Sequence, residues 1–232
     1  MCAIGEELMA DLKLRLCENM RTIVWPDSAF CFQDLPQFRV AAACEVPIPW
    51  LTLQNDLARA GVPPSNVRTL PDRPIADNVG AFLRGEIDVI QMLEPWADRL
   101  VKSGAEHGWH RFSQRGDIAY STFYALRSYI VANRDACRRL VSGLAAAQVA
   151  FQAAPPAAIA ESIGAWLPDL GAPPIARIIE GSREAQLWAT TPDLPLESFV
   201  RLKAAMVSGG LLGRDVAYPH VVDAPLSSAD PA

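Results

Sequence analysis

The stretch GEIDVIQMLEPWADRL, residues 85–100, decides the fold of this chain. Residues 87–93 are nearly continuous in apolar side chains, which predicts a strand that is buried on both faces of a parallel sheet. The strand nevertheless closes with Gln91 and Glu94, and a helix starts at once with Pro-Trp. A carboxylate at the end of a buried strand costs free energy unless another group binds it. The sequence therefore raises the question of which group the Glu94 carboxylate binds.

Short strands and helices alternate on both sides of this stretch. Such close alternation predicts βαβ units and an α/β fold with a parallel sheet. The strands are predicted at 39–44, 67–70, 87–93 and near 109–112, with helices at 49–61, 75–85 and 95–104.

The rest of the chain has a different pattern of residue types. Aromatic and β-branched residues predict an extended segment over 119–133. Helical spacing of apolar residues then predicts helices at 134–153, 156–167, 173–189 and 195–208. At the other end, Leu8, Leu12, Leu16 and Met20 recur every four residues and predict a helix over 5–20.

Composition excludes several classes of partner. The chain of 232 residues has a net charge of -5 and no basic block, which argues against binding to nucleic acid or an anionic membrane. Five cysteines without a CxxC pair favour reduced, mostly buried thiols. Glu6, Glu7 and Asp11 stand where a signal peptide needs an uncharged core, so a chain complete as given is expected in the cytoplasm.

Catalytic signatures are scarce in this sequence. It contains no GxGxxG, GxxxxGK[ST], HExxH or GxSxG pattern. The spacing of His107 and His110 would suit a metal, but no third ligand is placed nearby, and a role in a loop or strand edge is favoured. We therefore predict no catalytic residue, no bound metal and no cofactor.

Two turns after predicted strands carry similar residues. EVPIPW (45–50) follows the strand 39–44, and EPW (94–96) follows the strand 87–93. Ligands of open parallel sheets bind beyond the carboxyl ends of the strands, which predicts a ligand site at this edge. The alternative is that both acids favour helix N-termini by up to about 1 kcal/mol and that the tryptophans merely pack. The predicted ligand contacts from the two turns are Glu45, Pro47, Pro49, Trp50, Gln91, Glu94 and Trp96.

Three segments of the chain resemble the type II solute-binding proteins of ABC importers: residues 34–67, 78–104 and 119–155. The most specific part of the resemblance is GEIDVIQMLEP. The resemblance is to the branch that handles nitrate, sulfonates, taurine and the pyrimidine precursor of thiamine. It implies a periplasmic-binding-protein fold with two α/β lobes, a hinge and a ligand between the lobes. It also implies the membrane subunits of an importer as partners and a periplasmic location.

The resemblance also implies a division of the chain. Residues 34–130 would form the second lobe, residues 131–223 the helical part of the first lobe, and residues 224–232 a flexible tail. Residues 1–33, a helix and a linker, are too short to supply the front of the first lobe. We therefore expect an incomplete first lobe, whose uncovered surface would favour a homodimer.

Ligand chemistry follows from the charges in the two turns. The resemblance adds Tyr120, Ser121 and Thr122, where the chain crosses back, to the predicted contacts. Neither turn holds a Lys or Arg, so Glu45 and Glu94 would repel nitrate or a sulfonate. A small neutral or cationic heterocycle or aromatic amine fits better, because carboxylates accept its N–H groups and an aromatic ring stacks on it.

Two other functions stay open. One is an enzyme on the same fold: a thiamine-pyrimidine synthase would need clustered cysteines that this chain lacks, whereas a desulfinase-like enzyme would use Cys44 as nucleophile. The adjacent Glu45 would raise the pKa of that thiol, and Cys44 is expected to pack inside. The other is a structural or regulatory module that binds no ligand.

Overall fold

The structure is a computed structural model that describes residues 10–13, 20–24, 31–43, 47–70, 73–102 and 107–227. It divides into two compact units, each of which is described by itself. Unit 1 comprises residues 1–17, 117–202 and 214–232, and unit 2 comprises residues 18–116 and 203–213. Both units are therefore built from segments far apart in the sequence.

Unit 2 is built around a five-stranded sheet with the order β4-β3-β5-β2-β6. β3 is parallel to both β4 and β5, and β2 lies antiparallel between β5 and β6. The predicted parallel sheet is thus present, with one antiparallel strand, β2, inserted between β5 and β6. The strands are β2 (Met20–Val24), β3 (Arg39–Ala41), β4 (Arg68–Thr69), β5 (Val89–Leu93) and β6 (His107–Arg111).

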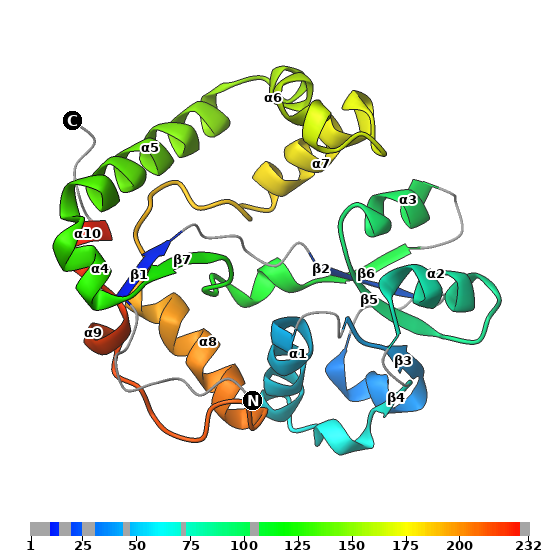
Figure 1. The fold of residues 1–232 in the computed structure, drawn as a ribbon. Coiled ribbons are helices and arrows are strands. Elements are labelled where there is room, and N and C mark those ends of the chain that lie inside the picture. Colours follow the sequence, from blue (N-terminus) through cyan, green and yellow to red (C-terminus); the bar gives the residue numbers. More distant parts are fainter. Residues whose placement is uncertain are drawn as a thin grey trace. The chain divides into compact units, whose positions relative to one another are not determined.

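Helices cover both faces of this sheet. Val40 and Val89 pack with α1 (Pro47–Arg59), whereas the next residues of the same strands, Ala41 and Ile90, pack with α2 (Ile75–Leu83) and α3 (Trp96–Lys102). Successive side chains of a strand point to opposite faces, so the continuous apolar run serves two cores. Figure 1 shows α1, α2 and α3 around these strands. Short 3-10 turns complete the unit at η1 (Phe32–Gln37), η2 (Pro64–Asn66) and η3 (Phe112–Arg115).

An ion pair fixes the starts of β3 and β5 to each other. The Arg39 guanidinium donates to both carboxylate oxygens of Asp88, at 2.6 and 2.9 Å, and also to the Gly85 carbonyl at 2.8 Å. The backbone N–H of Arg39 donates to Asp88 as well, at 2.8 Å. These hydrogen bonds lower the pKa of the Asp88 carboxyl, so it stays ionised and holds the register of the parallel pair.

Unit 1 is mainly helical. The 20-residue helix α5 (Arg134–Ala153) leads to the packed helices α6 (Pro156–Ile163) and α7 (Ala172–Glu184), which Figure 1 shows beside one another. A two-stranded ribbon, β1 (Ala10–Lys13) with β7 (Thr122–Ala125), is antiparallel, with Leu12 opposite Phe123. The other elements with residues in this unit are α4 (Arg127–Ala132), α6 (Pro156–Ile163), η4 (Gly164–Trp166), α7 (Ala172–Glu184), α8 (Leu196–Ser208), α9 (Tyr218–Val221) and α10 (Ala224–Ser227).

Helix α8 contributes residues up to Leu202 to unit 1 and residues from Lys203 to unit 2. At its end, Gly209 lies so close to Leu51 of α1 that a Cβ atom on Gly209 would stand 2.1 Å from a Leu51 methyl carbon. Only glycine fits this approach without displacing Leu51. Residues 203–213 are therefore an integral layer of unit 2.

Two sequence predictions are wrong. Residues 10–13 form strand β1 and residue 20 begins strand β2, where a helix over 5–20 was predicted. Pairing with β7 and β5 outweighs the four-residue spacing of leucines there. Over 119–133, only residues 122–125 are a strand, and helix α4 follows at 127–132, because the buried Ile130 joins the core that α5 covers.

The remaining element predictions are confirmed with shifted boundaries. The strand expected near 109–112 is β6 at residues 107–111, and the helix expected at 134–153 is α5 with the same bounds. The overall class is α/β, as predicted. In the described part of the chain, no helix combines the length and the apolar character needed to cross a bilayer.

Candidate ligand-binding site

Unit 2 has one sheet edge at which several predicted site residues lie. β3 and β5 are parallel neighbours, so their carboxyl ends meet at the same edge of the sheet. α1 begins at Pro47, shortly after β3, and α3 begins at Trp96, shortly after β5. We call this the carboxyl edge. Both helix N-termini therefore start from the edge at which open parallel sheets bind ligands.

Gln91 holds the carboxyl edge together. Its side chain is only 2% exposed. The Oε1 atom accepts a hydrogen bond from the backbone N–H of Ala43 at 3.2 Å, and Nε2 donates to the carbonyl of Pro49 at 3.3 Å. The amide thus joins Ala43, two residues after β3, to the first turn of α1. Gln91 has a positioning role here, and direct contact with a ligand stays a prediction.

The first turn of α1 presents few backbone donors. Pro47 and Pro49 lack an N–H group, so Ile48 and Trp50 supply the N–H groups of this turn. Pro47 is exposed, Pro49 is buried, and Trp50 packs half-buried against the core. The turn contains no acidic residue. It can therefore accept a ligand group of either sign but is a poorer anion cradle than a helix with four free donors.

Glu94 lies half-buried at the end of β5. Its Oε2 atom accepts a hydrogen bond from the backbone N–H of Asp98 at 2.9 Å, in the first turn of α3. The Glu94–Pro95 peptide bond is cis. The contact agrees with the alternative that the acid favours a helix N-terminus. With this hydrogen bond in place, the Glu94 side chain still lies at the carboxyl edge of the sheet.

A cation that the sequence analysis missed lies beside Trp96. The Arg99 guanidinium stands over the indole of Trp96, 5.2 Å from the ring centroid, in a cation–π contact. The two residues are three apart on α3, and that spacing places side chains on one helix face. Helical spacing in the sequence is therefore the signal that identifies Arg99.

The other predicted ligand contacts are not among the residues described at the carboxyl edge. Tyr120, Ser121 and Thr122 belong to unit 1, at the start of β7, and are half-buried. Nearby, the N–H of Ala119 donates to the Ser198 carbonyl at 3.2 Å, which fixes this segment to α8. Glu45 and Cys44 lie outside the described residues.

His110 stands in an aromatic cluster on β6. Its ring makes edge contacts with Phe32 and Phe112, with centroids 5.6 and 5.0 Å away, and Arg115 lies over Phe112. Burial, and secondarily the charge of Arg115, lower the pKa of His110 to about 4. Among the described residues, no three His, Cys, Asp or Glu side chains gather as a metal site would require.

This pKa predicts an acid-sensitive fold. The unfolded chain binds a proton at His110 near pH 6.5, whereas the folded chain binds it only near pH 4. The free energy of unfolding should therefore fall as the pH drops through that window, by roughly 1–2 kcal/mol after allowance for solvent screening. Urea unfolding at several pH values measures the slope. His110→Gln should flatten it and the exposed control His220→Gln should not; equal slopes in all three proteins would contradict the assignment.

Comparisons with known proteins bear on this geometry. No family model matches the chain. Over 162 residues the chain is 24% identical to YtlA, a candidate binding protein of Bacillus subtilis (strain 168), and the match covers 69% of this chain and 48% of YtlA. The chain thus spans about half the length of this curated relative.

Solved structures match most of the chain. The alkanesulfonate-binding protein SsuA from Xanthomonas axonopodis pv. citri, bound to MOPS, matches with a TM-score of 0.63 and 19% identity, over 96% of this chain and 74% of that protein. The desulfurization enzyme DSZB matches with a TM-score of 0.60 and 15% identity, over 96% and 78%. At such identities the likeness establishes the fold alone. The chain has the periplasmic-binding-protein fold that its sequence resembles.

Proposed function

We propose that this chain is a solute-binding protein, whose ligand is a small organic molecule held at the carboxyl edge of unit 2. The observation that carries the proposal is the Gln91 bridge, which ties the end of β3 to the start of α1 and so fixes the edge in advance. A preformed edge loses little conformational entropy when a ligand binds. By resemblance, the ligand would be delivered to the membrane subunits of an ABC importer, in the periplasm.

A neutral or cationic heterocycle or aromatic amine is the favoured ligand class. The half-buried Glu94 carboxylate can accept N–H groups, and the proposed aromatic contacts are Trp50 and Trp96, which follow β3 and β5 and are half-buried against different cores of the sheet. Glu45 and Tyr120–Thr122 belong to the proposed contacts on sequence grounds. A pyrimidine amine meets both requirements, since it carries N–H donors on a flat ring.

A sulfonate is the second candidate class, and Arg99 is the observation that favours it. Its guanidinium lies over Trp96 and puts a positive charge on α3, the helix that follows Glu94. The solved structure of SsuA that matches this fold binds a sulfonate buffer molecule, MOPS. The two classes predict opposite responses to the loss of the Glu94 charge.

The test is titration calorimetry of the chain with an aminopyrimidine and with MOPS. The variant Glu94→Gln removes the charge and keeps an acceptor for the N–H of Asp98. If an amine binds, a lost charge-assisted hydrogen bond of about 1.5–3 kcal/mol weakens affinity roughly 10- to 100-fold. If a sulfonate binds, Glu94→Gln should tighten affinity and Arg99→Gln should weaken it.

Glu86→Gln is the matched control, because Glu86 is an exposed carboxylate in the same unit that pairs with Arg84 at 2.7 Å. It stands before β5, whereas Glu94 stands after it. Equal affinities in Glu86→Gln and Glu94→Gln would remove Glu94 from the site. Absence of heat with both ligands, and absence of the roughly 2.7 kcal/mol stabilisation that a ligand at 100 times its Kd confers, would contradict both classes.

Desulfinase-like catalysis stays an alternative because DSZB shares the fold. It requires a reactive thiolate at Cys44. Alkylation kinetics with iodoacetamide separate it from simple binding: a nucleophilic Cys44 reacts much faster at neutral pH than an ordinary thiol of pKa about 8.5.

A further inference from the structure

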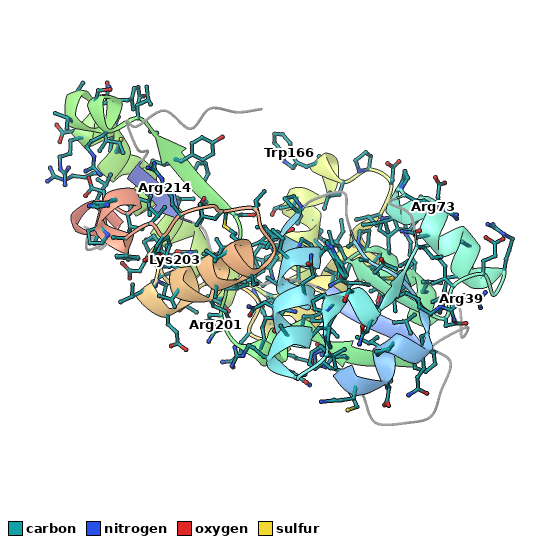
Figure 2. All side chains as sticks on the ribbon, turned by 90° about the horizontal axis from the view of Figure 1, so that it is seen from below. Arg39, Arg73, Trp166, Arg201, Lys203 and Arg214 are labelled. Atoms are coloured by element: carbon teal, nitrogen blue, oxygen red, sulfur yellow. The ribbon has the colours of Figure 1, made fainter. Side chains whose placement is uncertain are left out.

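Helix α2 also starts at the carboxyl edge of unit 2. It follows β4, which is parallel to β3, and its nine residues lead back to the start of β5. The backbone N–H of Leu70 still bonds to the carbonyl of Val40 at 3.0 Å, so only a short turn separates the sheet from α2. Figure 2 shows Arg73, just before α2, apart from Arg39, whose ion pair with Asp88 joins the starts of β3 and β5. The first turn of α2 therefore belongs to the same edge as the first turns of α1 and α3.

One buried side chain of α2 is polar although its neighbours are apolar. Asn78 is the fourth residue of α2 and is only 3% exposed. It lies three residues after Ile75 and four before Phe82, on the helix face that packs against the sheet. The core that this face meets includes Ile90, and Trp96 packs against the same core. Helical spacing therefore predicts an apolar residue at position 78, where the chain has an amide.

The Asn78 amide is only half satisfied. Its Nδ2 atom donates to the carbonyl of Arg73 at 3.4 Å, whereas Oδ1 is buried and accepts no hydrogen bond in the described part of the chain. Arg73 precedes the helix, so the Asn78 side chain reaches back to the start of α2, at the carboxyl edge. A buried acceptor without a partner costs free energy, and folded proteins keep few of them.

We propose that Asn78 is a further ligand contact at the carboxyl edge and that its Oδ1 atom accepts an N–H group of the ligand. The inference rests on the proposed function, and it selects between the two ligand classes. An aminopyrimidine carries the N–H donor that this oxygen lacks. A sulfonate group presents only oxygen acceptors, which the lone pairs of Oδ1 would repel.

The start of α2 can open to admit such a ligand. Its N-cap residue is Pro74, which makes no side-chain hydrogen bond to the first turn of the helix. A helix end without a side-chain cap frays more easily than a capped one. Arg73 is exposed, so its carbonyl can bond to water when the Asn78 amide turns toward a ligand. Binding then gives Oδ1 a hydrogen bond that it lacks in the free chain.

Titration calorimetry with two ligands tests this contact. 4-Aminopyrimidine and 4-methylpyrimidine have nearly the same shape and differ in the N–H group. The wild-type chain should bind the amine more tightly by roughly 5- to 150-fold, the factor that corresponds to one buried hydrogen-bonding group left without a partner. Asn78→Val, which is apolar and of moderate size, should remove most of this preference. Asn78→Ala, which cannot overfill the core, should remove it as well.

Asn66→Val is the matched control. Asn66 is an exposed asparagine of the same unit and lies just before β4, at the amino end of that strand. Its replacement should leave the preference for the amine unchanged. The denaturation temperature of the free chain is a second readout. Asn78→Val should stay within about 4 °C of the wild type, because the amide makes one long hydrogen bond to the exposed Arg73.

Three results would overturn the inference. A preference for the amine that survives both Asn78→Val and Asn78→Ala removes Asn78 from the site and leaves the proposed function standing. A denaturation temperature that both variants lower by more than about 10 °C shows that the amide serves the fold instead of the ligand. A wild-type chain that binds neither pyrimidine contradicts the proposed amine ligand together with this contact.

Discussion

Replacing Asp56 with alanine is expected to lower the free energy of unfolding by about 3–5 kcal/mol. Asp56 on α1 pairs with Arg115 on η3 at 2.6 Å, and their side chains are only 14% and 8% exposed. Arg115 also lies over the Phe112 ring at 4.6 Å. The variant leaves a buried guanidinium without its counter-charge, and this desolvation cost, rather than the attraction itself, makes the effect large. Guanidinium unfolding curves of both proteins measure the loss.

Two further variants test that reasoning. Asp77→Ala removes an exposed carboxylate from the first turn of α2 and should cost about 1 kcal/mol or less. The double variant with Asp56→Ala and Arg115→Met removes both charges, and it should be more stable than Asp56→Ala alone because no unpaired ion remains. If Asp56→Ala costs no more than Asp77→Ala, the pair behaves as a solvent-screened surface contact and the argument is wrong.

Replacing Phe82 with alanine should cost about 3–5 kcal/mol as well, for a different reason. Phe82 is completely buried and belongs to the core between α2, α3 and the sheet. Removing its ring forfeits the burial of a large apolar surface and leaves a cavity that the packed strand residues Ile90 and Met92 cannot fill. The effect should appear as a lower denaturant midpoint with an unchanged slope.

The next residue of the same helix provides the control. Leu83 is 53% exposed, so Leu83→Ala should change stability far less, by roughly 0.5 kcal/mol. A comparable loss in the two variants would mean that α2 packs on the sheet through a different face.

Most elements of unit 2 were predictable because their signal is local. A run of buried residues ending in a turn identifies β5, and proline at the start of α1 identifies a helix start. The strands β1 and β2 were not predictable, because their partners β7, β5 and β6 are far away in the sequence. Leucines spaced by four residues cannot report such pairing.

In the candidate site, too, some features were predictable from the sequence and others were not. The sequence places Glu94 and Trp96 at the end of a strand, and the structure has them there. The bonds of Gln91 to Ala43 and Pro49 depend on how β3 and β5 align, which no spacing in the sequence reveals. Arg99, by contrast, was available from helical periodicity once α3 was expected.

The close approach of Gly209 to Leu51 has a consequence for synthesis on the ribosome. Unit 2 begins early in the chain, yet its last layer is residues 203–213, which follow the whole of segment 117–202. At about 5–20 residues per second, that segment takes roughly 5–20 s to emerge. Throughout this interval the side of α1 around Leu51 lacks its cover, so we expect unit 2 to be completed only after residue 213 has emerged.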